Sequence, residues 1–144
     1  MEAEDKVKND VMEVLDNYAQ AYRDKNLQGI LKLFIDDDDL VIIGTGYDEW
    51  ITGKTELKSG FSRDMEQADS INVKFRDMTI SAAGNVSWLS GHMNMDAMVN
   101  GQEIFLPGRL SAVLEKRNDK WLFAHLHYSL PAAEQEKGEA WPEV

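Results

Sequence analysis

Apolar side chains between Val7 and Tyr22 recur three or four positions apart, the spacing that places them on one face of a helix. Acidic Glu4 and Asp5 precede them, in the first turn, where the helix dipole favours negative charge. The pattern therefore predicts a first helix over about residues 4–24.

A second, shorter helix is expected to begin after Asn26, a residue that caps helix N-termini well. Its apolar positions are Leu27, Ile30, Leu31 and Phe34. The acidic run 36–39 ends this helix, and residues 40–43 are apolar enough for a short buried strand. A loop over residues 44–53 is expected next, followed by a third helix. The apolar face of that helix carries Leu57, Phe61 and Met65.

The rest of the chain alternates between apolar and polar residues, as strands do. Three two-residue turn signals divide it: Gly84-Asn85, Asn100-Gly101 and Asn118-Asp119. The expected strands span residues 71–80, 86–99, 102–116 and 121–130. The element order ααβαββββ indicates an α+β domain with its helices on one face of a curved antiparallel sheet. We expect one domain over residues 1–131 and a polar tail over 132–144.

Composition narrows the function classes. Of 144 residues, 26 are Asp or Glu and 15 are Lys or Arg, giving a formal net charge of -11. A chain this acidic repels phosphate backbones and anionic lipid, so we expect neither nucleic-acid nor membrane binding. The absence of cysteine excludes disulfides and thiol chemistry. The acidic start of the chain is unlike a signal peptide, and we therefore expect a cytoplasmic location.

Two segments resemble a known group of proteins. Residues 18–38, with two tyrosines and the Leu-Phe-x-x-Asp ending at residues 33–37, are similar to the opening of ketosteroid-isomerase-like proteins. The hairpin 109–131, with its Arg-x-Ser, turn-Trp and His-x-His-x-Ser pattern, resembles the SnoaL-like branch of the nuclear transport factor 2 superfamily. It also resembles the association domain of calcium/calmodulin-dependent protein kinase II. The resemblance implies a cone-shaped, cystatin-like fold, in which a sheet of about five or six strands wraps around three helices.

Few functional residues of these similar proteins have a chemical equivalent in this chain. Tyr18 falls at the position of the isomerase's oxyanion-hole tyrosine, and Ser111 falls near its second oxyanion donor. The position of the catalytic base falls on Ile42, which cannot take a proton, so a steroid-type isomerase is disfavoured. The pocket arginine of the kinase association domain falls on Ala112.

Turn geometry offers a candidate site. With two-residue turns, Arg109 lies opposite His92 on one side and opposite Tyr128 on the other. One sheet face then carries Trp88, Ser90, His92, Arg109, Ser111 and Tyr128. An arginine flanked by such groups suits a carboxylate or enolate ligand, while a polar surface strip or a dimer contact is the alternative. A bulge at Pro107-Gly108 would shift this register.

His125 and His127 are two positions apart and so share one strand face, which in this register lies opposite Arg109. Their expected neighbours there are Leu110, Ala112, Leu114 and Phe123. A hydrogen-bonded core or interface role is favoured over metal chelation, because no third ligand is evident. We expect no metal and no cofactor.

The sequence thus favours a homodimeric pocket protein for a small, polar or anionic organic molecule. The expected ligand-binding residues are Tyr18, Tyr22, Trp50, Trp88, His92, Arg109, Ser111, His127 and Tyr128. An enzyme of the same branch, with His92 or His127 as general acid–base on a carbonyl compound, is one alternative. An oligomerisation module like the kinase association domain is another. Large side chains on both sheet faces predict that one face packs on a second subunit.

Overall fold

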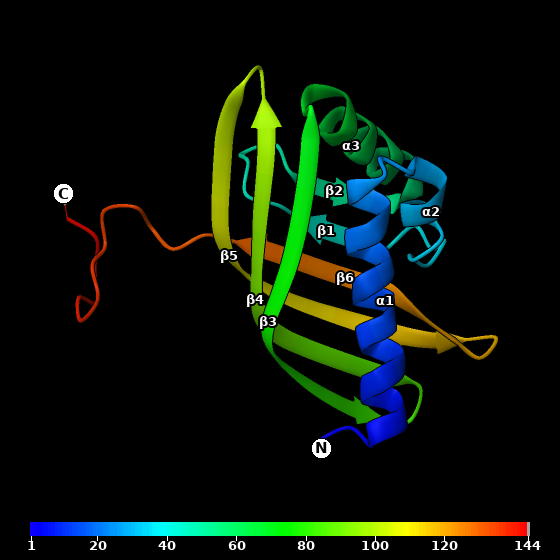
Figure 1. Cartoon of the computed structure of the whole chain (residues 1–144). Coiled ribbons are helices and arrows are strands. Elements are labelled where there is room, and N and C mark those ends of the chain that lie inside the picture. Colours follow the sequence, from blue (N-terminus) through cyan, green and yellow to red (C-terminus); the bar gives the residue numbers. More distant parts are fainter. Residues whose placement is uncertain (144) are drawn as a thin grey trace.

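The structure, a computed structural model, describes residues 1–143 and consists of three helices and six strands (Figure 1). In chain order the elements are α1 (Asp5–Arg23), α2 (Leu27–Leu31), β1 (Val41–Ile43), β2 (Trp50–Thr52), α3 (Gly53–Gln67), β3 (Ser70–Ala83), β4 (Val86–Val99), β5 (Gln102–Arg117) and β6 (Lys120–Ser129). The predicted helices and long strands are confirmed to within a few residues at their ends, except for the second helix. It ends at Leu31, before the expected Phe34, which instead forms an isolated bridge with Phe123. Asn26 caps α2 as expected, because its Oδ1 accepts a hydrogen bond from the Gly29 amide at 3.0 Å.

The strands form one sheet in the order β2-β1-β6-β5-β4-β3, antiparallel except where β1 runs parallel to β6. The sheet curves around the helices, which all lie on its concave side (Figure 1). This is the expected α+β cone. The sequence missed β2, which lies within the predicted loop 44–53. It has three residues, of which Trp50 and Thr52 are exposed, so it carries no apolar period to detect.

The predicted two-residue turns set the register of the meander. Asn100 and Gly101 adopt φ angles of 52° and 77°, and Val99 pairs with Gln102 across the turn. Asn118 and Asp119 likewise adopt positive φ, and they join strands whose last pair is Arg117 with Lys120. Positive φ at both positions matches the right-handed twist of the strands. As predicted, Arg109 therefore pairs with His92.

A bulge in β6 overturns the next step of the predicted register. Leu114 pairs with Phe123 but Val113 pairs with His125, so Ala124 is an extra residue on β6. The bulge considered at Pro107-Gly108 does not occur, since Met93 pairs with Gly108 in unbroken register.

One extra residue exchanges the two faces of the remaining strand. Arg109 consequently pairs with Ser129, and the predicted pairing with Tyr128 is wrong. His127 pairs with Ser111, so His125 and His127 share the face of Arg109 rather than the opposite one. Tyr128 turns instead to the concave face, where it is buried.

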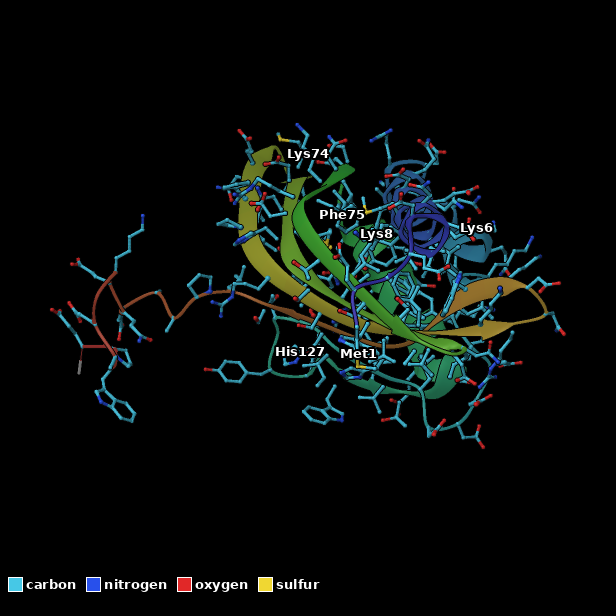
Figure 2. All side chains as sticks on the ribbon, turned by 90° about the horizontal axis from the view of Figure 1, so that it is seen from below. Met1, Lys6, Lys8, Lys74, Phe75 and His127 are labelled. Atoms are coloured by element: carbon cyan, nitrogen blue, oxygen red, sulfur yellow. The ribbon has the colours of Figure 1, made fainter. Side chains whose placement is uncertain are left out.

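The core lies between α1, α3 and the concave face of the sheet. Tyr18 is at its centre, with ring centroids 5.2 Å from Tyr22, 5.8 Å from Phe123 and 6.2 Å from Phe61. Phe75 of β3 reaches the same cluster, and Figure 2 shows it beside α1. Edge-to-face aromatic pairs of this kind stabilise a core beyond the area that they bury.

Residues 130–143, the described part of the chain after β6, form neither helix nor strand and run away from the sheet (Figure 1). Trp141 in this segment is 81% exposed. The boundary at residue 131 remains a prediction. In the part of the chain that the structure describes, no helix combines the length and the apolar character needed to cross a bilayer.

Candidate functional site

A cavity of about 430 Å³ lies between α1, α3 and the concave face of the sheet. Its walls are mainly apolar, with aliphatic and methionine side chains from the sheet and aromatic side chains from the helices. The lining residues are Tyr18, Tyr22, Ile42, Ile43, Gly44, Thr45, Glu49, Ile51, Leu57, Gly60, Phe61, Arg63, Asp64, Gln67, Ala68, Ile71, Met93, Met95, Ala97, Val99, Ile104, Leu106, Leu126 and Tyr128. This volume is within the range of small-molecule sites.

Local structure explains why these side chains converge. Tyr18 and Tyr22 are one helical turn apart on α1 and therefore share a face. Every second residue of β4 from Met93 to Val99 lines the cavity, as the alternation of a strand requires. Leu57 and Phe61 on α3 close the cavity from the helical side.

The mainly apolar wall of the cavity contains a hydrogen-bonded pair of polar side chains. The Tyr22 hydroxyl donates a hydrogen bond to Asp64 Oδ2 at 2.9 Å, joining α1 to α3. The Tyr18 ring packs edge-on against Tyr22. Burial raises the pKa of both tyrosines, so their hydroxyls stay protonated at neutral pH. This part of the cavity wall thus presents two phenols and the carboxyl group of Asp64.

Asp64 is held in an environment that disfavours its charge. Burial raises the pKa of the Asp64 carboxyl group, and the nearby Glu49 carboxylate raises it further. The hydrogen bond from Tyr22 and the charge of Arg63 lower this pKa in part, without offsetting the burial. A carboxyl group with a raised pKa on a cavity wall is typical of functional sites.

Tyr128 supplies a third phenol, from the sheet side. Its hydroxyl donates a hydrogen bond to the carbonyl oxygen of Leu106, and burial raises the pKa of Tyr128 to about 12. The ring lies against the backbone of Gly108, where a Cβ atom would be 2.1 Å from Tyr128 Cε1. Glycine at this position therefore makes room for the phenol.

The exposed lining residues mark the mouth of the cavity. They are Thr45 of the β1–β2 loop, Gln67 of α3 and Ile104 of β5. Arg63 holds the loop to α3, because its guanidinium is 2.8 Å from Asp48 Oδ2 and 3.4 Å from Glu49 Oε1. The positive charge of Arg63 is therefore paired with two carboxylates of this loop, at the rim of the cavity.

Three of the predicted site residues line the cavity: Tyr18, Tyr22 and Tyr128. The other six lie outside its lining: Trp50, Trp88, His92, Arg109, Ser111 and His127. Strand pairing places them together on the convex face, and Figure 2 shows His127 on the side of the sheet away from α1. The Arg109 guanidinium contacts Ser129 Oγ at 3.4 Å and the Leu130 carbonyl oxygen at 3.5 Å.

Sequence reasoning missed Asp64 and Glu49. A signal for Asp64 was present, since it follows Leu57 by seven positions and Phe61 by three, which puts a carboxyl group on the apolar face of α3. Glu49 gave no such signal, because it lies in an irregular loop.

The histidine pair has a local structural contact. His125 Nδ1 is 2.8 Å from the carbonyl oxygen of Val41, across the parallel β1–β6 pairing. Among residues 1–143, no three His, Asp or Glu side chains are grouped as a metal site requires.

Comparisons with known proteins agree with this architecture. A nuclear transport factor 2-like superfamily protein from Salmonella enterica is 23% identical, with 96% of this chain and 100% of that one covered and a TM-score of 0.84. A proposed dehydratase of the NTF2-like family from Streptomyces avermitilis is 14% identical, with 90% and 100% covered and a TM-score of 0.81. A proposed calcium/calmodulin-dependent protein kinase II association domain from Xanthomonas campestris is 19% identical, with 85% and 86% covered and a TM-score of 0.76.

A search of curated proteins finds no match. The family model described as the SnoaL-like domain matches residues 11–133, most of the chain and every element from within α1 to β6. This match shows that the chain belongs to the SnoaL-like domain family.

Proposed function

We propose that the cavity binds a small organic molecule with a largely apolar frame and one polar group. The observation that carries this proposal is the pairing of Asp64 with Tyr22 in a mainly apolar cavity of about 430 Å³. The apolar walls favour burial of the frame, and the few polar groups fix its orientation.

The charges at the cavity favour a neutral or cationic ligand over the anion that the sequence suggested. Asp64 and Glu49 both line the cavity, and Arg63 is the one cation among its described lining residues. Arg63 is already paired with Asp48 and Glu49. Arg109, the expected anion partner, lies on the other face of the sheet. A carboxylate ligand would meet like charge in the cavity.

Calorimetric titration with bicyclic probes tests the proposal. Tetralin provides the bare frame, and 2-tetralone, 2-aminotetralin and tetralin-2-carboxylate add a neutral, a cationic and an anionic group. We expect the ketone or the amine to bind more tightly than tetralin, and the carboxylate to bind least. If neither the ketone nor the amine binds more tightly than tetralin, the proposal fails.

Two neighbouring substitutions on β4 locate the binding site. Ala97 lines the cavity, so Ala97→Phe fills part of it and should abolish binding. Met98 follows on the same strand and points to the opposite face, so Met98→Phe is the matched control. If both variants lose binding equally, or if neither loses it, the ligand binds elsewhere.

An acid–base enzyme is a second candidate. The specific observation is the raised pKa of the Asp64 carboxyl group beside two phenols, an arrangement that suits proton transfer. His92 and His127, the histidines considered first, lie on the convex face instead. Deuterium exchange at the carbon next to the carbonyl of 2-tetralone would reveal such activity, and no exchange above the Asp64→Asn background would count against it.

The convex face supports a homodimer. Trp88 is 37% exposed and Phe105 is 53% exposed there, and Trp88 pairs with Val113. Exposed aromatic residues of this kind are enriched at subunit contacts. His92, Arg109, Ser111 and His127 would then be polar contacts of the interface.

Light scattering tests this assembly. We expect the wild-type protein to have twice the mass of one chain, and Trp88→Glu to reduce it to the mass of one chain. Tyr47→Glu alters an exposed residue of the β1–β2 loop and should leave the mass of the dimer unchanged. A monomeric wild-type protein would refute the homodimer, and a ring-sized mass would favour the oligomerisation module.

A further inference from the structure

The carboxyl group of Asp64 lacks a dedicated cation. Within residues 1–143, its one hydrogen bond to another side chain comes from Tyr22, on α1. Arg63, the adjacent residue on α3, directs its guanidinium to Asp48 and Glu49 in the β1–β2 loop. A carboxylate removed from water without a counter-charge is costly, and a bound cation offsets that cost.

The surfaces around Asp64 suit an organic cation. Tyr18, Tyr22 and Phe61 line the same cavity, with the Tyr22 and Phe61 ring centroids 5.5 Å apart and nearly perpendicular. The faces of aromatic rings attract cations through their quadrupole. Glu49 adds a second negative charge on the same side of the cavity.

We propose that the polar group of the ligand is a protonated amine, which donates a hydrogen bond to Asp64 while the aromatic rings of α1 and α3 surround its charge. This rests on the proposed function, because it names the ligand class of the same cavity. The net charge of -11 favours the approach of such a cation and disfavours organic acids.

The pH dependence has a defined sign. The groups that face Asp64 are Tyr18 and Tyr22 from α1, Arg63 from α3 and Glu49 from the β1–β2 loop. A bound ammonium favours the ionised carboxylate, so binding near the raised pKa of Asp64 releases a proton. Affinity for the amine should therefore fall as the pH drops through that pKa. Affinity for a neutral ketone should not.

The experiment compares 2-aminotetralin, 2-tetralone and tetralin-2-carboxylate by calorimetry. We expect the amine to bind most tightly. Asp64→Asn keeps the shape and a hydrogen-bond acceptor for Tyr22 but removes the charge, so it should weaken amine binding about 10- to 100-fold and change ketone binding little. Asp16→Asn, the same change at an exposed carboxyl group of α1 outside the cavity lining, is the matched control and should change neither.

The outcomes separate this inference from the proposed function. If the ketone binds in the cavity and the amine binds no better, the cation site is refuted while the proposed function stands. If the amine binds equally well to Asp64→Asn, its charge is recognised elsewhere, which also refutes the inference. If no probe binds more tightly than tetralin, both proposals fail.

Discussion

Removal of the Tyr22 hydroxyl probes the link between α1 and α3 at the cavity. Tyr22→Phe keeps the ring, which is 3% exposed and packed against Tyr18 and Phe61, so the core loses no apolar volume. What is lost is the hydrogen bond at 2.9 Å to Asp64 Oδ2. The change in the free energy of unfolding therefore reports on this bond and on the carboxyl group that it leaves unpartnered.

The expected cost depends on the charge of Asp64. A hydrogen bond to a charged group contributes about 1.5–3 kcal/mol, whereas a neutral one contributes about 0.5–1.5 kcal/mol. Tyr22→Phe should therefore destabilise the protein by about 2 kcal/mol when Asp64 is ionised, a change of about 30-fold in the unfolding constant. The cost should be about half as large when Asp64 is protonated.

Thermodynamic linkage gives the direction in which stability and the cost of Tyr22→Phe change with pH. Because burial raises the pKa of Asp64 on folding, wild-type stability decreases as the pH rises from the unfolded pKa through the folded pKa. The bond from Tyr22 lowers the folded pKa, so its removal raises that pKa further. The penalty of Tyr22→Phe is therefore smallest below the wild-type folded pKa and full above the higher folded pKa of the variant.

Urea unfolding at about pH 7 and at about pH 3.9, the ordinary pKa of Asp, measures both effects. Asp64→Asn is the control background, since an amide accepts a neutral hydrogen bond and does not titrate in this range. There, the cost of Tyr22→Phe should be small and independent of pH. Equal costs at both pH values, or the same cost in the wild-type and Asp64→Asn backgrounds, would refute the role assigned to the carboxylate.

Two further substitutions test local geometry. Gly108→Ala should displace the Tyr128 phenol, because a Cβ atom there would be 2.6 Å from Tyr128 Cζ and 2.7 Å from a backbone oxygen. Overpacking of this kind costs about 1–3 kcal/mol, and an unchanged thermal melt would contradict it. Asn26→Ala should cost about 1 kcal/mol in urea unfolding, because the Gly29 amide loses its cap. A loss as large as that from a core truncation would show that Asn26 does more than cap α2.

Much of the fold could be predicted because its signals are local. The helical period of α1, the Asn26 cap and the Asn100-Gly101 turn each depend on neighbouring residues, and each occurs as expected. The pairing of Arg109 with His92 followed from that turn, because a two-residue loop leaves one register for the strands that it joins.

The candidate site was predicted only in part. Tyr18 and Tyr22, two of the expected ligand-binding residues, line the cavity. Tyr128 also lines it, although the predicted register had placed it beside Arg109, on the other face. Asp64 was overlooked because its importance depends on Tyr22, which is 42 positions away in the sequence and 2.9 Å away in space.

The sequence by itself determined the element order, the turns and the α+β class, because helix periods, caps and type I′ turns are set by residues a few positions apart. Tertiary structure alone decided which face of the last hairpin meets the cavity. The bulge at Ala124 adds one residue to β6, and no residue near it in the sequence indicates a bulge. Because strand faces alternate with a period of two, this one residue moved His127 to the convex face and Tyr128 into the cavity.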